Sequence, residues 1–411
     1  MLWFKLGWRN LWRNKRRTII EVVSIGGTVF LGVAWNNLAM GSYEKMINDG
    51  VKMGSGHIGF YHPDYLEMRK TEQVIDTSRL VDELEREPDV LGVYPRLNVP
   101  GLVRSSHDSR ATILMGIEFD REVAVNPLLK KKRIIEGEMP SDKHERGALI
   151  GAKLAKELDL GVGKKFVIMA QGKDGEIVSG LLRVTGILKS NIQEIDAAAV
   201  LLDREKLGAI IGYEQSAHEV AVLFKNYKYA RKMYPRFKDI AGQYPGTEAF
   251  YWEEAMSELA DAVNYDHAAL KVTIAILYVI VGIGTVNTLL MSVMERTREF
   301  GVIRAIGTSK KNIRKMVFSE ALVLALVGVF FGIILAVLVG FYTSIHGIDF
   351  SGMFEEQGSA GVLIEPLIKS IWDISGMITF SIGMIIVSLL SSLYPAHRVM
   401  KIQPSDAMRI Y

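Results

Sequence analysis

The sequence contains no cysteine, which excludes disulfide bonds and thiolate metal sites. It also lacks the phosphate-binding loop of an ATPase, Gly-x-x-x-x-Gly-Lys-Ser/Thr. The two Gly-Lys pairs, at residues 163–164 and 172–173, have neither the upstream glycine nor the following hydroxyl. The formal net charge is only +3, so the overall charge gives no indication of nucleic-acid binding. What remains informative is where apolar and charged residues lie along the chain.

Histidines and short glycine motifs give no clear catalytic or metal site. His57, His62 and Asp64 could in principle gather a metal, but their spacing matches no recognised ligand set, so ordinary loop contacts are expected. Residues 54–59 match the dinucleotide pattern Gly-x-Gly-x-x-Gly, with no convincing strand before them and no helix after them. A chance match in a loop is therefore expected. We expect no catalytic residue, cofactor or metal ion in this chain.

Long apolar segments are the main feature that the sequence does have. A membrane-spanning helix needs roughly 20 mainly apolar residues. The first of the apolar windows also contains Glu21, Asn36 and Asn37 near its ends, where polar side chains are expected to extend to the membrane interface. A cleaved signal peptide is the alternative for this window, but its apolar stretch is too long and no small-residue cleavage site follows. The four windows are Ile19–Met40, Leu270–Met294, Met316–Tyr342 and Ile371–Leu393.

Charges in the short flanking segments predict how these helices are oriented. Basic residues are concentrated before the first window, between the second and third, and after the fourth, whereas residues 346–370 are mainly acidic. Cytoplasmic flanks of membrane proteins carry the excess of Lys and Arg. Both termini and residues 295–315 are therefore expected in the cytoplasm, and residues 42–268 outside it.

Two further patterns concern the membrane helices. Phe4, Trp8, Leu11 and Trp12 recur at spacings of three and four, with cations on the opposite side, as in a helix lying in the inner-membrane interface. A basic flank without fixed shape is the alternative. In the third window, Gly328 and Gly332 belong to a stripe of small residues that would let two helices approach closely. Packing within the chain and dimerisation explain this stripe equally well.

The sequence pattern of residues 42–268 predicts a mixed α/β domain. Alternating apolar segments between turn residues indicate strands, and 3.6-residue periodicity with capping residues indicates helices. A composition change near residues 120–132 suggests two subdomains. The expected helices are Ser78–Arg86, Ala148–Asp159 and Glu253–Tyr265, the last leading directly into the second window. The expected strands are Val90–Tyr94, Val99–Val103, Ala111–Ile117, Lys165–Ala170, Leu181–Leu188 and Ala198–Leu202.

The densest signal lies in the cytoplasmic segment 295–315. It is highly charged and expected to be helical until Gly307, yet Val302, Ile303 and Ile306 form a small apolar face. A solvated connector does not need such a face, whereas a docking surface for a cytoplasmic partner does. Arg296 and Arg298 are expected to be exposed.

At these residues the chain closely resembles the FtsX/MacB/LolE superfamily of ABC transporter permeases. The resemblance runs through nearly the whole chain in order, so together its motifs are highly specific. The matching segments are Gly7–Arg17, Ile135–Gly137, Leu149–Ala155, Gly161–Lys165, Val184–Ile187, Asn287–Gly307, Ser319–Ala321, Tyr394–Arg398 and Ile402–Arg409.

The resemblance implies a dimeric permease in the bacterial inner membrane, paired with a second copy or a paralogue. It also implies a separate cytoplasmic ATPase subunit that holds ATP and Mg²⁺, and mechanotransmission from that subunit to the outer domains. Chain length and the lack of a fused ATPase look most like the LolC/LolE group, which releases lipoproteins to a periplasmic carrier. The ATPase-coupling residues would be Glu295, Arg296, Arg298, Glu299, Val302, Ile303, Arg304, Ile306 and Gly307.

Two other functions stay open. The chain could serve in MacB-like efflux of small molecules or peptides with a periplasmic adaptor, or act as a membrane regulator or sensor without transport. In every case membrane lipids surround it. The expected segments are an interfacial helix (1–17), four membrane helices (18–41, 269–294, 316–345 and 371–395), the periplasmic α/β domain (42–268), the coupling segment (295–315), a periplasmic loop (346–370) and a cytoplasmic tail (396–411).

Overall fold

A computed structural model describes residues 9, 12–141, 144–225, 227–350, 357–359, 362–364 and 367–401. The chain divides into two compact units. A helical unit comprises Met1–Tyr43, Tyr265–Asp349 and Leu367–Tyr411, and an α/β unit comprises Glu44–Asn264 and Phe350–Pro366. Each unit has its own apolar cores.

Four helices are long and apolar enough to cross a membrane, as the sequence predicts. Two of them have 39 residues each, and a helix of that length extends about 58 Å, which is longer than a hydrocarbon core of about 30 Å. The fourth begins at Ile374 rather than Ile371, since Asp373 caps it by accepting a hydrogen bond from the Gly376 amide. The helices are α2 (Lys15–Met53), α11 (Ser257–Glu295), α13 (Lys310–His346) and α14 (Ile374–Ser391), which continues as α15 (Leu393–Met400).

The stripe of small residues packs within the chain. A Cβ added at Gly332 would lie 2.6 Å from the Gly26 carbonyl oxygen, and one added at Gly26 would lie 2.9 Å from the Gly328 carbonyl oxygen. Helices α2 and α13 therefore approach through their backbones at Gly26, Gly328 and Gly332. The structure gives this stripe an intrachain partner.

The polar residues of α2 do not reach the membrane interface as expected. Glu21 is only 3% exposed, and its Oε1 has no hydrogen-bond partner among the described residues. Asn36 donates to the Asp373 carboxylate, and Asn37 is buried and accepts from the Asp373 amide. The expectation of snorkelling side chains is wrong for Glu21 and Asn37, because neighbouring helices enclose these two groups, whereas Asn36 is half-buried.

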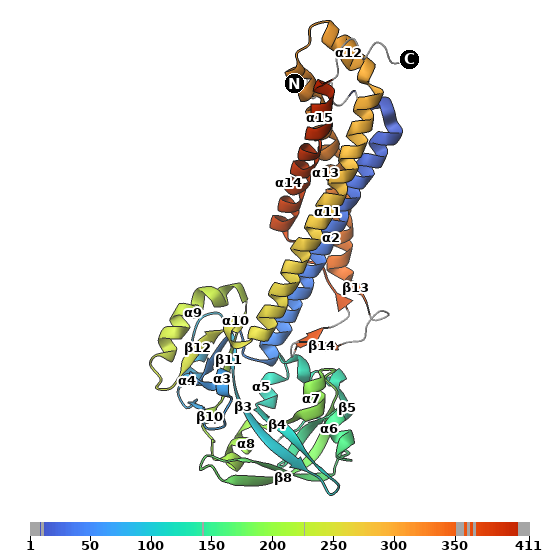
Figure 1. Cartoon of the computed structure of the whole chain (residues 1–411). Coiled ribbons are helices and arrows are strands. Elements are labelled where there is room, and N and C mark those ends of the chain that lie inside the picture. The colour runs from blue at the N-terminus through green and yellow to red at the C-terminus, as the bar shows by residue number, and fades with distance from the viewer. Residues whose placement is uncertain are drawn as a thin grey trace. The chain divides into compact units, whose positions relative to one another are not determined.

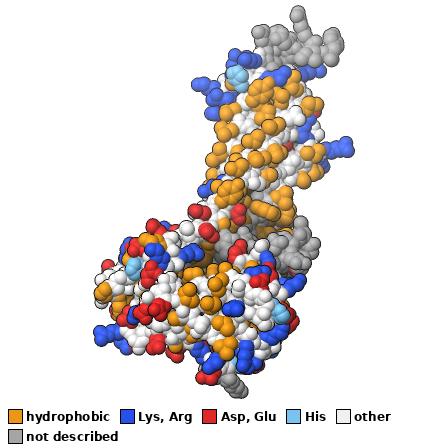
Figure 2. Space-filling view, turned by 60° about the horizontal axis from the view of Figure 1, so that its bottom comes forward, with side chains coloured by type: hydrophobic (Ala, Val, Ile, Leu, Met, Phe, Trp, Pro, Cys, Tyr) orange, Lys and Arg blue, Asp and Glu red, His pale blue; other side chains and the backbone are white. Residues whose placement is uncertain are grey.

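The start of α2, the connection from α11 to α13 and the end of α15 lie at the same end of the helical unit (Figure 1). Lys and Arg side chains gather at this end, while hydrophobic side chains cover much of the visible length of the unit (Figure 2). The sequence between α13 and α14, expected as a loop, contains two short strand pairs: β13 (Ile348–Asp349) with β16 (Leu367–Ile368), and β14 (Gln357–Ser359) with β15 (Val362–Ile364).

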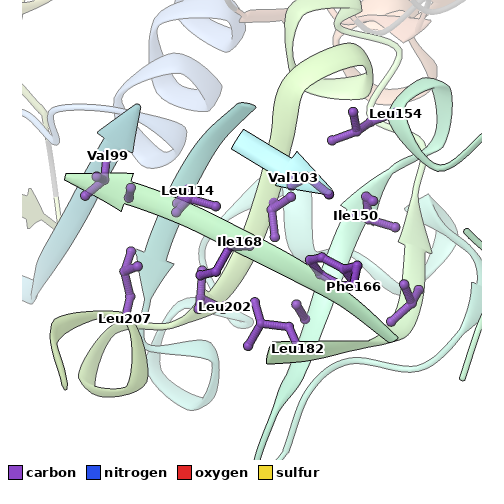
Figure 3. Packing of buried hydrophobic residues seen from close by; sticks show 14 of the residues in the cluster. Val99, Val103, Leu114, Ile150, Leu154, Phe166, Ile168, Leu182, Leu202 and Leu207 are labelled. Atoms are coloured by element: carbon purple, nitrogen blue, oxygen red, sulfur yellow. The ribbon is translucent and has the colours of Figure 1, made fainter. Parts of the chain in front are cut away.

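The α/β unit contains a ring of six strands. Strand β3 pairs with β4, and the pairing continues through β9, β6, β8 and β7 back to β3. Side chains such as Val99, Leu114 and Phe166 point into this ring and form its core (Figure 3). The strands are β3 (Val90–Arg104), β4 (Ser109–Ile117), β6 (Gly147–Gly151), β7 (Lys165–Gln171), β8 (Ile177–Leu188) and β9 (Ala199–Asp203), with β5 (Ile134–Gly137) paired to β8.

A second core lies where the first half of β3 joins an antiparallel sheet in the order β12-β1-β11-β3. The longer of the helices packed there, α9, buries Phe237 in this core. The strands are β1 (Ile58–Tyr61), β11 (Glu219–Phe224) and β12 (Glu248–Tyr251), with the short pair β2 (Ile75–Asp76) and β10 (Ser216–Ala217). The helices packed on this core are α4 (Leu80–Glu85) and α9 (Tyr227–Ala241).

The remaining elements of the α/β unit are short. They are α3 (Tyr65–Met68), α5 (Phe119–Glu122), α6 (Ala152–Glu157), α7 (Gln193–Ala198), α8 (Arg204–Ile211), α10 (Trp252–Ala255) and the 3-10 turns η2 (Pro127–Leu129) and η3 (Lys131–Arg133). Another 3-10 turn, η1 (Trp12–Asn14), precedes α2 in the helical unit.

Several expectations for this unit are corrected. Val90–Tyr94 and Val99–Val103 are one strand, because β3 passes through Pro95 while changing its partner from β11 to β4. Residues 148–150, expected in a helix, form the buried strand β6, and only residues from Ala152 onward are helical. A short apolar run of this kind fits either element by periodicity alone. The two cores divide along β3 rather than near residues 120–132.

The predicted helix at the end of the α/β unit is interrupted. It divides at Met256 into α10 and the start of α11. The short helix expected at Ser78–Arg86 begins at Leu80, after Arg79 in the N-cap position, and has no side-chain cap.

Candidate functional site

The charged segment between α11 and α13 forms a short separate helix, α12 (Thr297–Ala305). Helix α11 ends at Glu295, before α12 begins. Gly307 lies in the turn between α12 and α13, and its φ of +104° is a conformation that glycine adopts without strain. Ser309 then caps α13 by accepting a hydrogen bond from the Asn312 amide. Turn residues on both sides thus fix α12 as a discrete element of nine residues.

One face of α12 is anchored to the helical unit. Phe300 is 1% exposed and lies in a cluster with Val293 of α11, Val317 of α13 and Val399 of α15. Burying a Phe side chain contributes roughly 1.5–3 kcal/mol. The closing motif around Tyr394–Arg398 contributes to the same cluster through Ala396, and residues 402–411 lie outside the described part. Sequence analysis missed Phe300. It is a large apolar residue within a charged segment and lies seven residues after Val293, which could have indicated a buried position.

Ion pairs reinforce this anchor. The Arg296 guanidinium donates to Glu320 of α13 at 3.1 Å and to Glu299 at 3.3 Å, and it lies 5.2 Å from the centroid of the Phe300 ring. Arg17 of α2 donates to Glu295 at 2.5 Å. The expectation that Arg296 is exposed is therefore wrong, since its side chain is only 12% accessible. Arg296 and Glu295 hold helix ends together within the chain.

The opposite face of α12 is exposed. Val302 is 43% exposed, and Ile306, which directly follows the helix, is 81% exposed, whereas Ile303 lies one turn after Phe300 and is only partly exposed. Arg298 is exposed as expected, whereas Glu299 and Arg304 each have an interaction partner in the chain. The arrangement is an anchored helix that presents apolar side chains outward, which is the geometry of a docking element.

Of the four residues expected on an interfacial helix, only Trp12 is described. It lies in η1 and is 54% exposed. Phe4, Trp8 and Leu11 lie outside the described residues.

A buried ionic network in the α/β unit was not foreseen. Arg96 of β3 is 2% exposed, and its guanidinium donates to both carboxylate oxygens of Glu122, at 2.9 and 2.8 Å, and to Glu219 at 3.1 Å. The same guanidinium donates to the carbonyl oxygens of Lys52, Met53 and Gly54 at the end of α2. Because the last carbonyls of a helix have no partner within it, Arg96 caps α2.

Histidines in this unit are structural. His57 is buried, and its Nδ1 accepts a hydrogen bond from the Phe224 amide. Burial lowers the pKa of His57 to about 4 and that of His218 also to about 4, so both side chains are neutral at pH 7. His62 instead lies near Asp64, with 3.9 Å between Nδ1 and Oδ2. Among the described residues no cluster of acidic or histidine side chains could hold a metal ion.

The Gly-x-Gly-x-x-Gly match also has the wrong setting for a nucleotide. It follows helix α2 and leads into strand β1, the reverse of the strand–loop–helix order that a dinucleotide site requires.

Comparison with known proteins places the helical region in a family. Residues 271–404 match the family model described as FtsX-like permease C-terminal. The chain is 21% identical over 427 residues to the lipoprotein-releasing system transmembrane protein LolE of Haemophilus influenzae, covering 98% of each chain. It is 25% identical to the uncharacterized ABC transporter permease YknZ of Bacillus subtilis, over 64% of this chain and 62% of YknZ.

A third relative is the macrolide export ATP-binding/permease protein MacB of Nitrosomonas europaea, 22% identical over 82% of this chain and 51% of that protein. Among solved structures, the periplasmic region of MacB from Actinobacillus actinomycetemcomitans is similar to 53% of this chain and is itself covered to 98%, with 13% identity and a TM-score of 0.37. Residues 271–404 therefore match the FtsX-like permease domain, and the chain as a whole is similar to ABC transporter permeases of the FtsX/MacB/LolE type.

Proposed function

We propose that this permease couples ATP hydrolysis in a separate cytoplasmic ABC ATPase subunit to movement of its outer α/β unit. The observation that carries the proposal is α12, which is anchored through Phe300 and leaves Ile306 81% exposed. A force applied to the exposed face would pass through Phe300 and Arg296 to α11, α13 and α15. Coupling of this kind is mechanotransmission, in which the substrate needs no cytoplasmic route.

The proposed orientation follows from charge. The α12 end of the helical unit carries the gathered Lys and Arg side chains (Figure 2), and the positive-inside rule assigns such an end to the cytoplasm. Both termini are then cytoplasmic, the α/β unit is periplasmic, and the membrane is the bacterial inner membrane. Two copies, or one copy and a paralogue, would pair with the ATPase subunits.

For the cargo we propose lipoproteins, released from the inner membrane towards a periplasmic carrier. Supporting this choice, the similarity to LolE extends over 98% of both chains, whereas the similarity to MacB covers 51% of that protein. Efflux with a periplasmic adaptor is the second candidate, favoured by the MacB relatives. Depletion in the native host, followed by mass spectrometry of both membranes, separates the two. Lipoproteins retained in the inner membrane support release, while unchanged sorting with altered drug or peptide sensitivity overturns it.

Co-purification tests the ATPase partner. We expect a small ABC ATPase to be recovered repeatedly with the full-length chain from its native host, and its consistent absence would favour a regulator or sensor. The purified chain alone should neither bind nor hydrolyse ATP, because it has no phosphate-binding loop.

A further inference from the structure

A concave site lies wholly within the α/β unit. It is a groove of about 410 Å³ whose lining includes Tyr61, Tyr65 and, from β4, Ile113 and Met115. Small-molecule sites in proteins typically measure about 300–1,000 Å³, are mainly apolar and carry a few polar groups. The size and lining of this groove fit that description.

Most of the groove lining is apolar. Tyr61 and Tyr65 stack with ring centroids 5.9 Å apart and planes 12° apart, and both are buried. Ile113, which also lines the groove, is 49% exposed although it lies in the middle of a strand. Pro100, paired with Ile113 across β3 and β4, extends the same surface. An aliphatic chain would cover these side chains.

The groove lining contains two charged side chains, Glu219 and Arg69, and they differ in whether they are free to pair with a ligand. Glu219 is already engaged, because one carboxylate oxygen accepts from the Tyr61 hydroxyl at 2.8 Å and the other from Arg96 at 3.1 Å. Arg69 is exposed and has no ion-pair partner among the described residues. Its backbone is left-handed, with φ of +49°, because Arg69 ends helix α3 and its amide donates to the Tyr65 carbonyl oxygen. The available charge at the groove is therefore positive.

We propose that this groove binds a single-chain amphiphile with a carboxylate head group, such as a long-chain fatty acid. The chain lies against Tyr61, Tyr65 and Ile113, and the carboxylate pairs with Arg69. An extended peptide fits less well, because its repeated amides would need more polar partners than this lining offers. The proposal does not depend on which cargo the permease carries.

The floor of the groove connects this site with the long helix α2. Gly54, Tyr61 and Glu219 line the groove and also belong to the network in which Arg96 caps α2. A ligand in the groove would therefore contact the residues that hold the end of this helix. The site is placed to sense or to influence the position of α2.

The test uses the full-length protein in lipid nanodiscs and a photoreactive probe, myristic acid carrying a diazirine on its chain. We expect cross-links on peptides containing Tyr61–Tyr65 and Ile113–Met115, found by mass spectrometry. Arg69→Gln should reduce labelling of these peptides about tenfold, the effect of one charge-assisted hydrogen bond, and Arg69→Lys should restore part of it. Labelling of α11 and α13, which contact lipid, provides an internal control.

The matched diazirine derivative of myristyl alcohol tests the head group. It should label the groove about tenfold less than the acid, and Arg69→Gln should not change that level. Equal labelling by acid and alcohol, or no effect of Arg69→Gln, would overturn the assignment of a carboxylate. Labelling confined to the membrane helices, or absent altogether, would overturn the site itself. Ile113→Glu places a charge in the groove at a side chain that is 49% exposed, and it should abolish groove labelling by both probes.

Discussion

The Arg96 guanidinium forms a bidentate ion pair with the Glu122 carboxylate, and neither side chain is accessible to water. Breaking such a pair leaves a buried charge without compensation, which costs about 3–5 kcal/mol. In this protein Arg96 also donates to three carbonyl groups at the end of α2. The same side chain thus stabilises the α/β unit and fixes where the helix ends.

Replacing Arg96 should therefore have a large effect. We expect Arg96→Met to lower the free energy of unfolding of the α/β unit by about 3–5 kcal/mol, and Arg96→Met combined with Glu122→Gln to recover part of that loss. Thermal unfolding of the full-length protein and hydrogen exchange at residues 44–264 measure both. As a control, Arg110→Met removes the exposed pair with Glu157 and should leave unfolding unchanged. Similar behaviour of the two arginine variants would refute a structural role for the network.

The two faces of α12 should respond differently to substitution. Ile306→Asp places a charge on the exposed face, so we expect normal folding and membrane insertion but loss of ATPase binding and of stimulated ATP turnover. Ile303→Asp should act in the same direction. Phe300→Ala opens a cavity in the anchor and should destabilise the helical unit by about 3–5 kcal/mol.

Arg298→Glu is the matched control, because Arg298 is exposed on the same helix and exposed charges contribute about 1 kcal/mol or less. Partner binding is measured by co-purification and turnover by phosphate release. Wild-type turnover in both isoleucine variants would show that α12 is only a connector between membrane helices.

Packing at Gly332 gives a prediction about the membrane helices. Gly332→Ala would bring a methyl group to 2.6 Å from the Gly26 carbonyl oxygen, so α2 and α13 must separate. Overpacking of this kind typically costs about 1–3 kcal/mol. Gly27→Ala, where no atom lies within 4 Å, should leave stability unchanged. Thermal unfolding in detergent tests the pair, and a change of oligomeric state without loss of stability in Gly332→Ala would contradict intrachain packing.

Sequence patterns predicted those parts of the structure that depend on local chemistry. Four apolar windows identified the membrane helices. Alternation of apolar and polar residues identified β4, β7 and β8, because burying one face of a strand places an apolar residue at every second position. The apolar face at Val302, Ile303 and Ile306 was also visible in the sequence, since helical periodicity alone groups these residues.

Other features depend on contacts between distant residues. Arg96 finds its partners 26 and 123 residues away, so nothing in its neighbourhood distinguishes it from a surface arginine. Glu21 was expected at the membrane interface because its neighbours in the sequence give no sign of burial. The helices that bury it follow much later in the chain. The site residues missed by pattern analysis are those whose environment is assembled only by the tertiary fold.

Buried histidines predict how the stability of the α/β unit depends on pH. The pKa of His57 and of His218 is lowered to about 4 by burial, whereas the unfolded chain has the ordinary value of about 6.5. Between these values the unfolded state binds more protons than the folded state, so stability falls as pH decreases from about 6.5 to about 4. Each histidine contributes on the order of 3 kcal/mol to this loss. The full loss should be reached near pH 4, with no further change from these groups below it.

Single substitutions separate this effect from general acid denaturation. His218→Asn and His57→Gln should each make the unfolding free energy less dependent on pH between 4 and 6.5, even where they lower stability at pH 7. His107→Asn is the matched control for removal of a histidine side chain from the surface, because the His107 side chain is 66% accessible to solvent. Chemical unfolding of the full-length protein across this pH range provides the measurement. A wild-type profile that is flat from pH 7 to 4, or unchanged in both buried-histidine variants, would show that folding does not lower the pKa of these residues.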